Sequence, residues 1–567
     1  MRHAITLILA GSLFIASSPV TGVAQTTLPR EHTPRPTSAA ITPGDLMTRL
    51  YIFADDSMQG REAGTIGNVK GTDYIAAEAR RIGLTPAGDD GSYFQTVPYK
   101  TRTLDTASVL SVGGSRLALG EDYLPLGRDA VSVDEMPIVY GGAIGDTATL
   151  TAEQAKGKLV VLSVARGGGI MALRSAPSVE GAAALAVVGL DQLPPQFRRY
   201  FTRPQGFVDD PDAPQAGGDQ TILLVSGAAA AKMFTSPLDQ LHVGDAGATA
   251  ALHLRWDIRP MPYPSRNVVA VIPGSDPQLR GEYVALGAHN DHIGFSHQPV
   301  AADSIRIWNR VVRPEGADDA ANQATPAQQA RVDSMLAAYR AAHPGSARLD
   351  SISNGADDDG SGSVALLEIA QKMMSLDPKP RRSMLFVWHV GEEKGLLGSR
   401  YFTDHPTVPR DSIVTQLNMD MIGRGDAEDE TGRTKDGEPV HGGPNYLMLV
   451  GSRRLSTELG DLVETVNTED HHDLRFDYSF DADGHPANIY CRSDHYEYAR
   501  YGIPIVFFTT GLHRDYHQVT DEPEYIDYTH MAKVVSFIDD VAEHVADLDH
   551  RVVVDHPKPD PNGTCRQ

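Results

Sequence analysis

Five short segments in the second half of the chain carry histidines and carboxylates, most of them directly after an apolar run. They are, in chain order, Ala288-His289-Asn290-Asp291-His292, Gly355-Ala356-Asp357-Asp358-Asp359, Gly391-Glu392-Glu393-Lys394, Leu417-Asn418-Met419-Asp420 and Asp515-Tyr516-His517. Imidazoles and carboxylates with no thiolate among them are typical of a hydrolytic zinc centre that keeps coordination positions open to water. One such segment alone would indicate little, but the five together predict a metal-dependent hydrolase.

Strands and helices that alternate along the chain must bring these segments together. After Pro260, strand-like runs alternate with helix-like segments such as Val364 to Met374, which indicates an α/β sandwich with a largely parallel sheet. Because open α/β sheets bind ligands at the carboxyl ends of their strands, we expect the five segments to meet there. The predicted strands are Asn267 to Ile272, Tyr283 to Leu286, Ser383 to His389, Ile413 to Asn418 and Ile503 to Phe508.

His289 and Asp291 follow the strand Tyr283 to Leu286. A carboxylate two residues beyond a histidine can hold the imidazole in the tautomer that binds a metal ion. An isolated His-x-Asp pair is more often an ordinary surface histidine with its neighbour. The metal-binding interpretation of this pair therefore depends on the other four segments.

Three consecutive aspartates, Asp357 to Asp359, precede Gly360-Ser361-Gly362 and a predicted helix. One of these carboxylates can bridge two cations, while the other two can cap the start of the helix. The four letters Gly-Ala-Asp-Asp also occur at Gly316-Ala317-Asp318-Asp319, where no Gly-Ser-Gly turn follows and the surroundings are polar. We therefore do not assign this second copy to the metal site.

Glu392 and Glu393 come directly after the strand Ser383 to His389. Neighbouring carboxylates at a strand end can take separate roles, so that one binds metal and the other takes the proton from the attacking water. Without the other motifs, two consecutive glutamates would more often be exposed residues at the start of a helix.

The last two segments add a carboxylate, a phenol and an imidazole. Asp420 closes a predicted strand, and His517 stands in the loop after the strand Ile503 to Phe508. Tyr516 could donate its hydroxyl to a developing oxyanion, although a tyrosine buried for packing would give the same sequence. Asp521 is placed to orient His517, or is an ordinary turn aspartate.

In their types and order these motifs resemble the M28 family of zinc metallopeptidases, the co-catalytic dizinc aminopeptidases. The resemblance covers residues 43–99 and 266–545. It implies a three-layer α/β sandwich around a largely parallel mixed sheet, the zinc exopeptidase fold. It also implies two Zn²⁺ ions per chain, and substrates that are peptides or proteins with a free N-terminus.

The resemblance also implies a role for each motif residue. His289 and Asp420 would bind one zinc, Glu393 and His517 would bind the other, and Asp357 would bridge both. Glu392 would be the general base. Asp291 and Tyr516 would complete the catalytic residues, and the peptide bond between Asp357 and Asp358 would be cis.

The start of the chain predicts export. Arg2 and His3 precede an apolar stretch from Ala4 to Ala16, and Gly22-Val23-Ala24 has the small-x-small pattern of a signal cleavage site. We therefore expect a secreted or periplasmic protein. No later run is long and apolar enough to span a bilayer.

Composition and motifs divide the chain into six parts. Between the two peptidase parts lies a region of short Val, Ile and Leu runs, which resembles a protease-associated (PA) domain. A polar insertion separates His289 from Asp357. It is longer than expected in compact family members and could form a lid. The predicted parts are 1–24 signal peptide, 25–42 flexible linker, 43–107 first part of the peptidase domain, 108–258 PA-like insert, 259–548 main part with the insertion 298–353, and 549–567 tail.

The net charge excludes some classes of binding partner, and the cysteine content allows one disulfide. A formal net charge of −24 argues against nucleic acid and anionic membranes, because phosphate binding draws on clustered Lys and Arg. The two cysteines, Cys491 and Cys565, could form a bridge in an oxidising compartment or remain free thiols.

Other functions of the same fold stay open at this stage. They are a carboxypeptidase or dipeptidase, a single-zinc cyclase acting on N-terminal glutamine, and a receptor-like binding module without catalysis. All the expected ligand positions and the expected base are present, which favours the enzyme.

Overall fold

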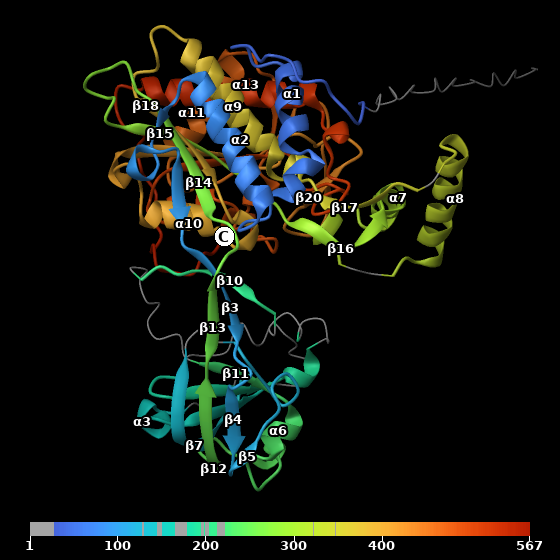
Figure 1. Ribbon diagram of the computed structural model, residues 1–567. Helices are drawn as coiled ribbons and strands as arrows, with labels where there is room; N and C mark the ends of the chain where they lie inside the picture. The colour runs from blue at the N-terminus through green and yellow to red at the C-terminus, as the bar shows by residue number, and fades with distance from the viewer. Residues whose placement is uncertain are drawn as a thin grey trace, which may run out of the picture.

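The computed structural model describes residues 28–567 apart from 127–129, 145–149, 165–178, 194–197, 199–202, 212–220, 321–322 and 346. The signal peptide predicted over residues 1–24 lies outside the described residues. The chain forms a large α/β body with a smaller β-rich domain below it in Figure 1. Among the helices that are described, none combines the length and apolar character needed to cross a bilayer.

A sheet of nine strands forms the centre of the large body. Its four middle strands run parallel, in the order β18 (Ser383–His389), β15 (Tyr283–His289), β19 (Ile413–Met419) and β24 (Ile505–Thr509). The flanking strands β14 (Ser265–Ile272) and β22 (Tyr446–Val450) are antiparallel to their neighbours β18 and β24. The outer strands are β1 (Thr85–Pro86), β2 (Phe94–Val97) and β23 (Arg475–Asp477).

Helices cover both faces of this sheet because its strands are apolar on both sides. In β18, Met384, Phe386 and Trp388 point into one core, while Leu385 and Val387 point into the other. The first core is closed by α1 (Pro43–Phe53), α2 (Ile66–Ile82), α9 (Gly362–Ser375), α11 (Thr457–Glu469) and α13 (Tyr528–Asp547), and the second by α10 (Leu397–Asp404) and α12 (His495–Ala499). The predicted α/β sandwich with a mixed sheet is confirmed, with its parallel strands at the centre.

The β-rich domain is inserted between β2 and β14. It is built on an eight-stranded sheet in the order β5-β4-β12-β7-β8-β9-β11-β6, with an apolar core on each face. The strands are β4 (Val109–Val112), β5 (Ser115–Arg116), β6 (Tyr123–Pro125), β7 (Val131–Ala143), β8 (Leu159–Ser163), β9 (Ala184–Val188), β11 (Ile222–Val225) and β12 (Ala246–Leu254). A ribbon of β10 (Gln205–Val208), β3 (Tyr99–Leu104) and β13 (Trp256–Pro260) joins it to the large body. Its resemblance to a PA domain stays a prediction.

A second insertion leaves the sheet after β15. Strands β16 (Gly294–Ala301) and β17 (Leu349–Ser353) pair antiparallel and enclose two helices, α7 (Ala302–Val312) and α8 (Pro326–Ala342). The 3-10 turn η5 (Gly316–Asp318) lies between the helices. Figure 1 shows α8 at the outer edge of the molecule, with α7 between it and the large body.

Candidate metal centre

The segments singled out in the sequence meet at the carboxyl ends of the parallel strands. His289 is the last residue of β15, Glu393 follows β18, and Asp420 follows β19. His517 lies in the loop after β24. The remaining segment, Gly355 to Asp359, forms the turn before α9 and places Asp358 in the middle of these side chains.

Asp358 lies between two groups of donors, and each of its carboxylate oxygens faces one group. Its Oδ1 is 3.1 Å from His289 Nε2, and the same nitrogen is 3.6 Å from Asp420 Oδ1. On the other side, Asp358 Oδ2 is 3.0 Å from His517 Nε2, which is also 3.0 Å from Glu393 Oε2. A carboxylate in this position can be shared by two cations.

The carboxylate that lies between the two groups of donors is that of Asp358, one residue after Asp357, to which the family resemblance gave the bridging role. Asp357 accepts a hydrogen bond of 2.7 Å from the Gly423 N–H, and its other oxygen lies 3.3 Å from His513 Nε2. Its side chain therefore points away from the two groups of donors. The cis peptide bond also lies one residue later than expected, between Asp358 and Asp359.

Asp521 and Asp359 account for the shape of this turn. Asp521 accepts hydrogen bonds from the backbone N–H groups of Asp357 and Asp358, so its carboxylate holds the turn, which is the second of the two roles that the sequence left open. Asp359 accepts from the N–H groups of His289 and Gly362 at 3.0 and 2.8 Å. One of the three aspartates thus caps α9, as the sequence suggested.

Asp291 acts on the backbone near Glu392 as well as on His289. Its main-chain oxygen lies 3.1 Å from His289 Nδ1, whereas its carboxylate is 3.8 Å from that nitrogen. The carboxylate instead accepts from the N–H groups of Gly391 and Glu392, at 2.7 and 3.2 Å. Asp291 therefore orients the imidazole through its carbonyl and holds the Glu392 segment through its side chain.

His292 was not assigned a role from the sequence, although it stands in the first of the five segments. Its ring is completely buried, with Nδ1 2.7 Å from Glu393 Oε1 and 3.7 Å from Asp358 Oδ2. The ring also packs edge-to-face against His517. His292 therefore belongs to the second group of donors. In the sequence, only its position three residues after His289 could have indicated this role.

The electrostatics favour positive charge on both sides of Asp358. Burial alone would raise the pKa of Asp358, but the imidazoles of His289 and His517 beside its carboxylate bring that pKa well below the ordinary value. Burial lowers the pKa of His517, yet Asp358 and Glu393 outweigh this effect and raise it to about 11. These contacts favour the ionised form of Asp358 and the protonated form of His517.

Glu392 differs from these carboxylates. Burial raises the pKa of Glu392 well above its ordinary value, and nearby Asp420 and Glu393 add to the rise against the opposing effect of His289. No imidazole of the two groups pairs with Glu392 in the described structure. A carboxyl group with a raised pKa is better suited to taking up a proton than an ordinary glutamate.

The donor set fits divalent metal ions. Within the described residues, His289 Nε2, Asp358 Oδ2 and Glu393 Oε1 are buried and form no hydrogen bond of regular geometry, although charged side chains lie within 3.1 Å of each. Buried polar atoms without partners are rare, and a cation would satisfy all three. Nitrogen and oxygen donors without sulfur suit zinc in a hydrolytic site.

A pocket opens beside the two groups of donors. Asp358, Glu392, Asp420 and His517 line one side of it, and Tyr516 and Arg492 also reach it. The remaining wall is largely apolar, formed by Met421, Phe480, Ile489, Phe507 and Leu512. The pocket can therefore hold an apolar side chain next to the charged groups.

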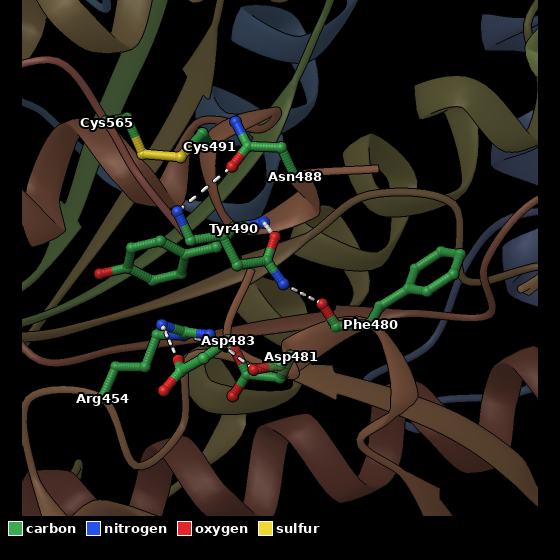
Figure 2. Close-up of a disulfide and its surroundings, with 9 residues drawn as sticks. Arg454, Phe480, Asp481, Asp483, Asn488, Tyr490, Cys491 and Cys565 are labelled. Carbon is green, nitrogen blue, oxygen red and sulfur yellow. Dashed lines mark hydrogen bonds and ion pairs between the residues drawn. A yellow bond between two sulfur atoms is a disulfide. The ribbon is translucent and has the colours of Figure 1, made fainter. Parts of the chain in front are cut away.

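The pocket wall is fastened to the tail of the chain. A disulfide joins Cys565 to Cys491 (Figure 2). In the sequence, Cys491 lies between the pocket residues Ile489 and Arg492. Gln567 adds hydrogen bonds, accepting from the Tyr490 N–H at 3.0 Å and donating from its own N–H to Asn488 Oδ1 at 3.2 Å. The two cysteines, left open by the sequence, are thus paired, and they brace the segment that shapes the pocket.

Removing this bridge should weaken both stability and substrate binding. The double substitution Cys491→Ser with Cys565→Ser is expected to lower the free energy of unfolding by about 2–4 kcal/mol. It should also raise KM more than it lowers kcat, because the wall residues loosen while the metal ligands stay in place. Denaturant unfolding and steady-state kinetics test this, and each single substitution should match the double one. Unchanged KM in all three variants would show that the bridge does not shape the pocket.

Comparison with known proteins agrees with the site. Residues 267–542 match Peptidase family M28. Leupeptin-inactivating enzyme 1 of Streptomyces exfoliatus is 41% identical over 78 residues, which are 13% of this chain and 18% of that protein. Leucine aminopeptidase 1 of Trichophyton rubrum is 26% identical over 197 residues, 33% of this chain and 49% of that protein. The chain thus spans about half, or less, of these relatives.

Two solved structures align over most of their length. The alignment with an aminopeptidase from Aneurinibacillus sp. strain AM-1 covers 92% of this chain and 97% of that protein, with 15% identity and a TM-score of 0.45. For the zinc aminopeptidase BSAP from Bacillus subtilis, the alignment covers 89% of this chain and 95% of BSAP, with 16% identity and a TM-score of 0.41. It is the match over residues 267–542, which contain His289, Asp358, Glu393, Asp420 and His517, that assigns the family. Through this match, the region of residues 267–542 belongs to peptidase family M28.

Proposed function

We propose that the protein is a dizinc aminopeptidase that hydrolyses the N-terminal peptide bond of peptides. The observation that carries this proposal is the position of Asp358 between two groups of donors, with Glu392 beside them in the same pocket. His289 and Asp420 would hold one zinc, and Glu393 and His517 the other, with Asp358 shared. His292 would keep Glu393 in place through its contact with Oε1.

The residues of the chain divide the chemistry among them. When bound, zinc polarises the scissile carbonyl and lowers the pKa of the attacking water. Glu392 takes the proton from that water and returns it to the leaving amine, a task that suits its raised pKa. Asp291 holds the backbone of Glu392 so that its carboxyl faces the pocket. Tyr516 donates its hydroxyl to the carbonyl oxygen as negative charge develops there.

The pocket also supports the exopeptidase assignment. A substrate with a free N-terminus carries an ammonium group, which the carboxylates of Glu392 and Asp420 can attract. The apolar wall formed by Met421, Phe480 and their neighbours favours an apolar first side chain. Names of relatives such as leucine aminopeptidase agree with this preference.

Export is part of the proposal. The signal sequence predicted over residues 1–24 would direct the protein to the periplasm or the medium. The disulfide between Cys491 and Cys565 supports an oxidising compartment, where such bridges persist.

Metal content and substrate choice test the function together. We expect purified protein to contain two zinc ions per chain by elemental analysis. It should hydrolyse aminoacyl p-nitroanilides with a free amine, it should not hydrolyse their N-acetylated forms, and chelation should stop the reaction until zinc is restored. Cleavage of the blocked substrates would instead indicate a carboxypeptidase or endopeptidase. One zinc would favour the cyclase, and neither metal nor turnover would favour a binding module.

A further inference from the structure

The second insertion is docked on the loop that carries Tyr516 and His517. Gly316, in η5, has a left-handed backbone with φ of 61°, and a Cβ at this position would lie 2.8 Å from the carbonyl oxygens of His513 and Tyr516. The next residue, Ala317, donates its N–H to the Tyr516 carbonyl at 3.2 Å. Only glycine allows the turn to approach the loop this closely.

Helix α7 holds the same loop from the preceding turns of the insertion. Asn309 is only 1% exposed and donates from Nδ2 to the Arg514 carbonyl at 3.0 Å. Arg306 donates from Nε to both oxygens of the buried Asp515, at 3.2 and 3.3 Å. Buried side chains that bond to backbone carbonyls fix the loop in one position. The insertion is therefore attached to the loop that carries Tyr516 and His517.

Asp318, at the end of η5, contacts Arg492, which lines the pocket. Its two carboxylate oxygens accept from Arg492, at 2.7 Å from Nη1 and 3.2 Å from Nη2, which is the bidentate arrangement. Arg492 Nη2 also donates to the phenolic oxygen of Tyr516 at 3.4 Å. The side chains of Asp318 and Arg492 are 27% and 37% exposed, so both can be changed without disturbing a core.

The direction of these hydrogen bonds matters for Tyr516. Because the guanidinium donates to the phenolic oxygen, the Tyr516 hydrogen cannot point at Arg492 and is left free to point into the pocket. Without Asp318, Arg492 would lose the carboxylate that fixes it. It could then move away from the phenolic oxygen, and the Tyr516 hydrogen would no longer be directed into the pocket.

We propose that Asp318 of the insertion is a positioning residue for the reaction: it fixes Arg492, and through Arg492 it sets the direction of the Tyr516 hydroxyl. The insertion thereby completes the catalytic pocket. This inference rests on the proposed function, in which Tyr516 donates to the carbonyl oxygen. It gives a task to the Gly316-Ala317-Asp318-Asp319 segment, which the sequence excluded from the metal site.

The test compares Asp318→Ala with a matched change elsewhere in the insertion. Asp333 is exposed on α8 and bonds to Gln329, so Asp333→Asn removes the same charge without touching the pocket. We expect Asp318→Ala to lower kcat about fivefold with KM changed by less than about twofold, and Asp333→Asn to behave as wild type. Asp318→Asn, which keeps the shape and loses the charge, should fall between them.

A double substitution separates positioning from a general structural effect. In a Tyr516→Phe background, Asp318→Ala should cost nothing further, because the hydroxyl that it positions is gone. An equal loss in both backgrounds, or an Asp318→Ala variant as active as Asp333→Asn, would overturn the inference. If wild type does not hydrolyse free-amine substrates at all, the proposed function fails. If wild type is active and Asp318→Ala is normal, only the role of Asp318 fails.

Discussion

Replacing Glu392 with glutamine should lower kcat by about 10³-fold while the zinc content of the protein stays unchanged. The amide has the shape of the carboxyl group but cannot take a proton from water or return it to the leaving amine. Metal binding should survive, because the side chains that surround Asp358 do not include Glu392. Steady-state hydrolysis of a free-amine aminoacyl substrate, with elemental analysis of the same preparation, measures both quantities.

The neighbouring residue provides the control for this experiment. Glu393→Gln changes the same chemical group one position along the chain, but Glu393 contacts His517 and His292 among the donors. This variant should lose zinc as well as activity, and added zinc should restore part of the activity. Near-normal turnover of Glu392→Gln with both ions bound would remove Glu392 from the mechanism.

Exchanging Asp358 for asparagine should abolish measurable turnover and reduce zinc binding on both sides of the site. Each oxygen of Asp358 faces a different group of donors, so one substitution weakens both. Asp357→Asn should be much milder, with an effect of about tenfold or less, because Asp357 supports the turn through Gly423 and His513. Zinc content and kcat of the two variants, measured side by side, distinguish the two adjacent aspartates.

This comparison also decides between the assignments from sequence and from structure. If Asp357→Asn loses both ions and Asp358→Asn keeps them, the bridging residue is the one expected from the sequence. Thermal unfolding of both variants controls for loss of fold, since Asp521 holds the backbone of both residues. The expected result is a folded Asp358→Asn protein without activity.

The sequence allowed most of the sheet to be predicted because its strands are apolar on both faces. The expected strand Ser383 to His389 has the observed bounds of β18, and four of the five motifs follow parallel strands. A buried run next to polar residues is a local signal, which is why it can be found without a structure. The types of the donor residues followed from the same pattern.

What could not be predicted depends on contacts between distant parts of the chain. Three consecutive aspartates look alike, and the backbone N–H groups held by Asp521 determine which one faces the donors. The Asp291 carboxylate was expected on His289, two residues away, but it bonds to Gly391, a hundred residues later. Asp318 and Arg492 are also far apart in the sequence, and their pairing depends on how the insertion folds back.

The bridge between Cys491 and Cys565 has a consequence for when the enzyme becomes fully active. All the donor residues and Glu392 are synthesised well before residue 565, so a nascent chain can assemble the metal site first. The substrate wall is fastened only later, once Cys565 has emerged and the surroundings are oxidising. Copies that are still in a reducing cytoplasm would then bind zinc but process peptides poorly. Together with the export proposed above, the disulfide would thus spare cytoplasmic peptides and delay full activity until the protein has left the cytoplasm.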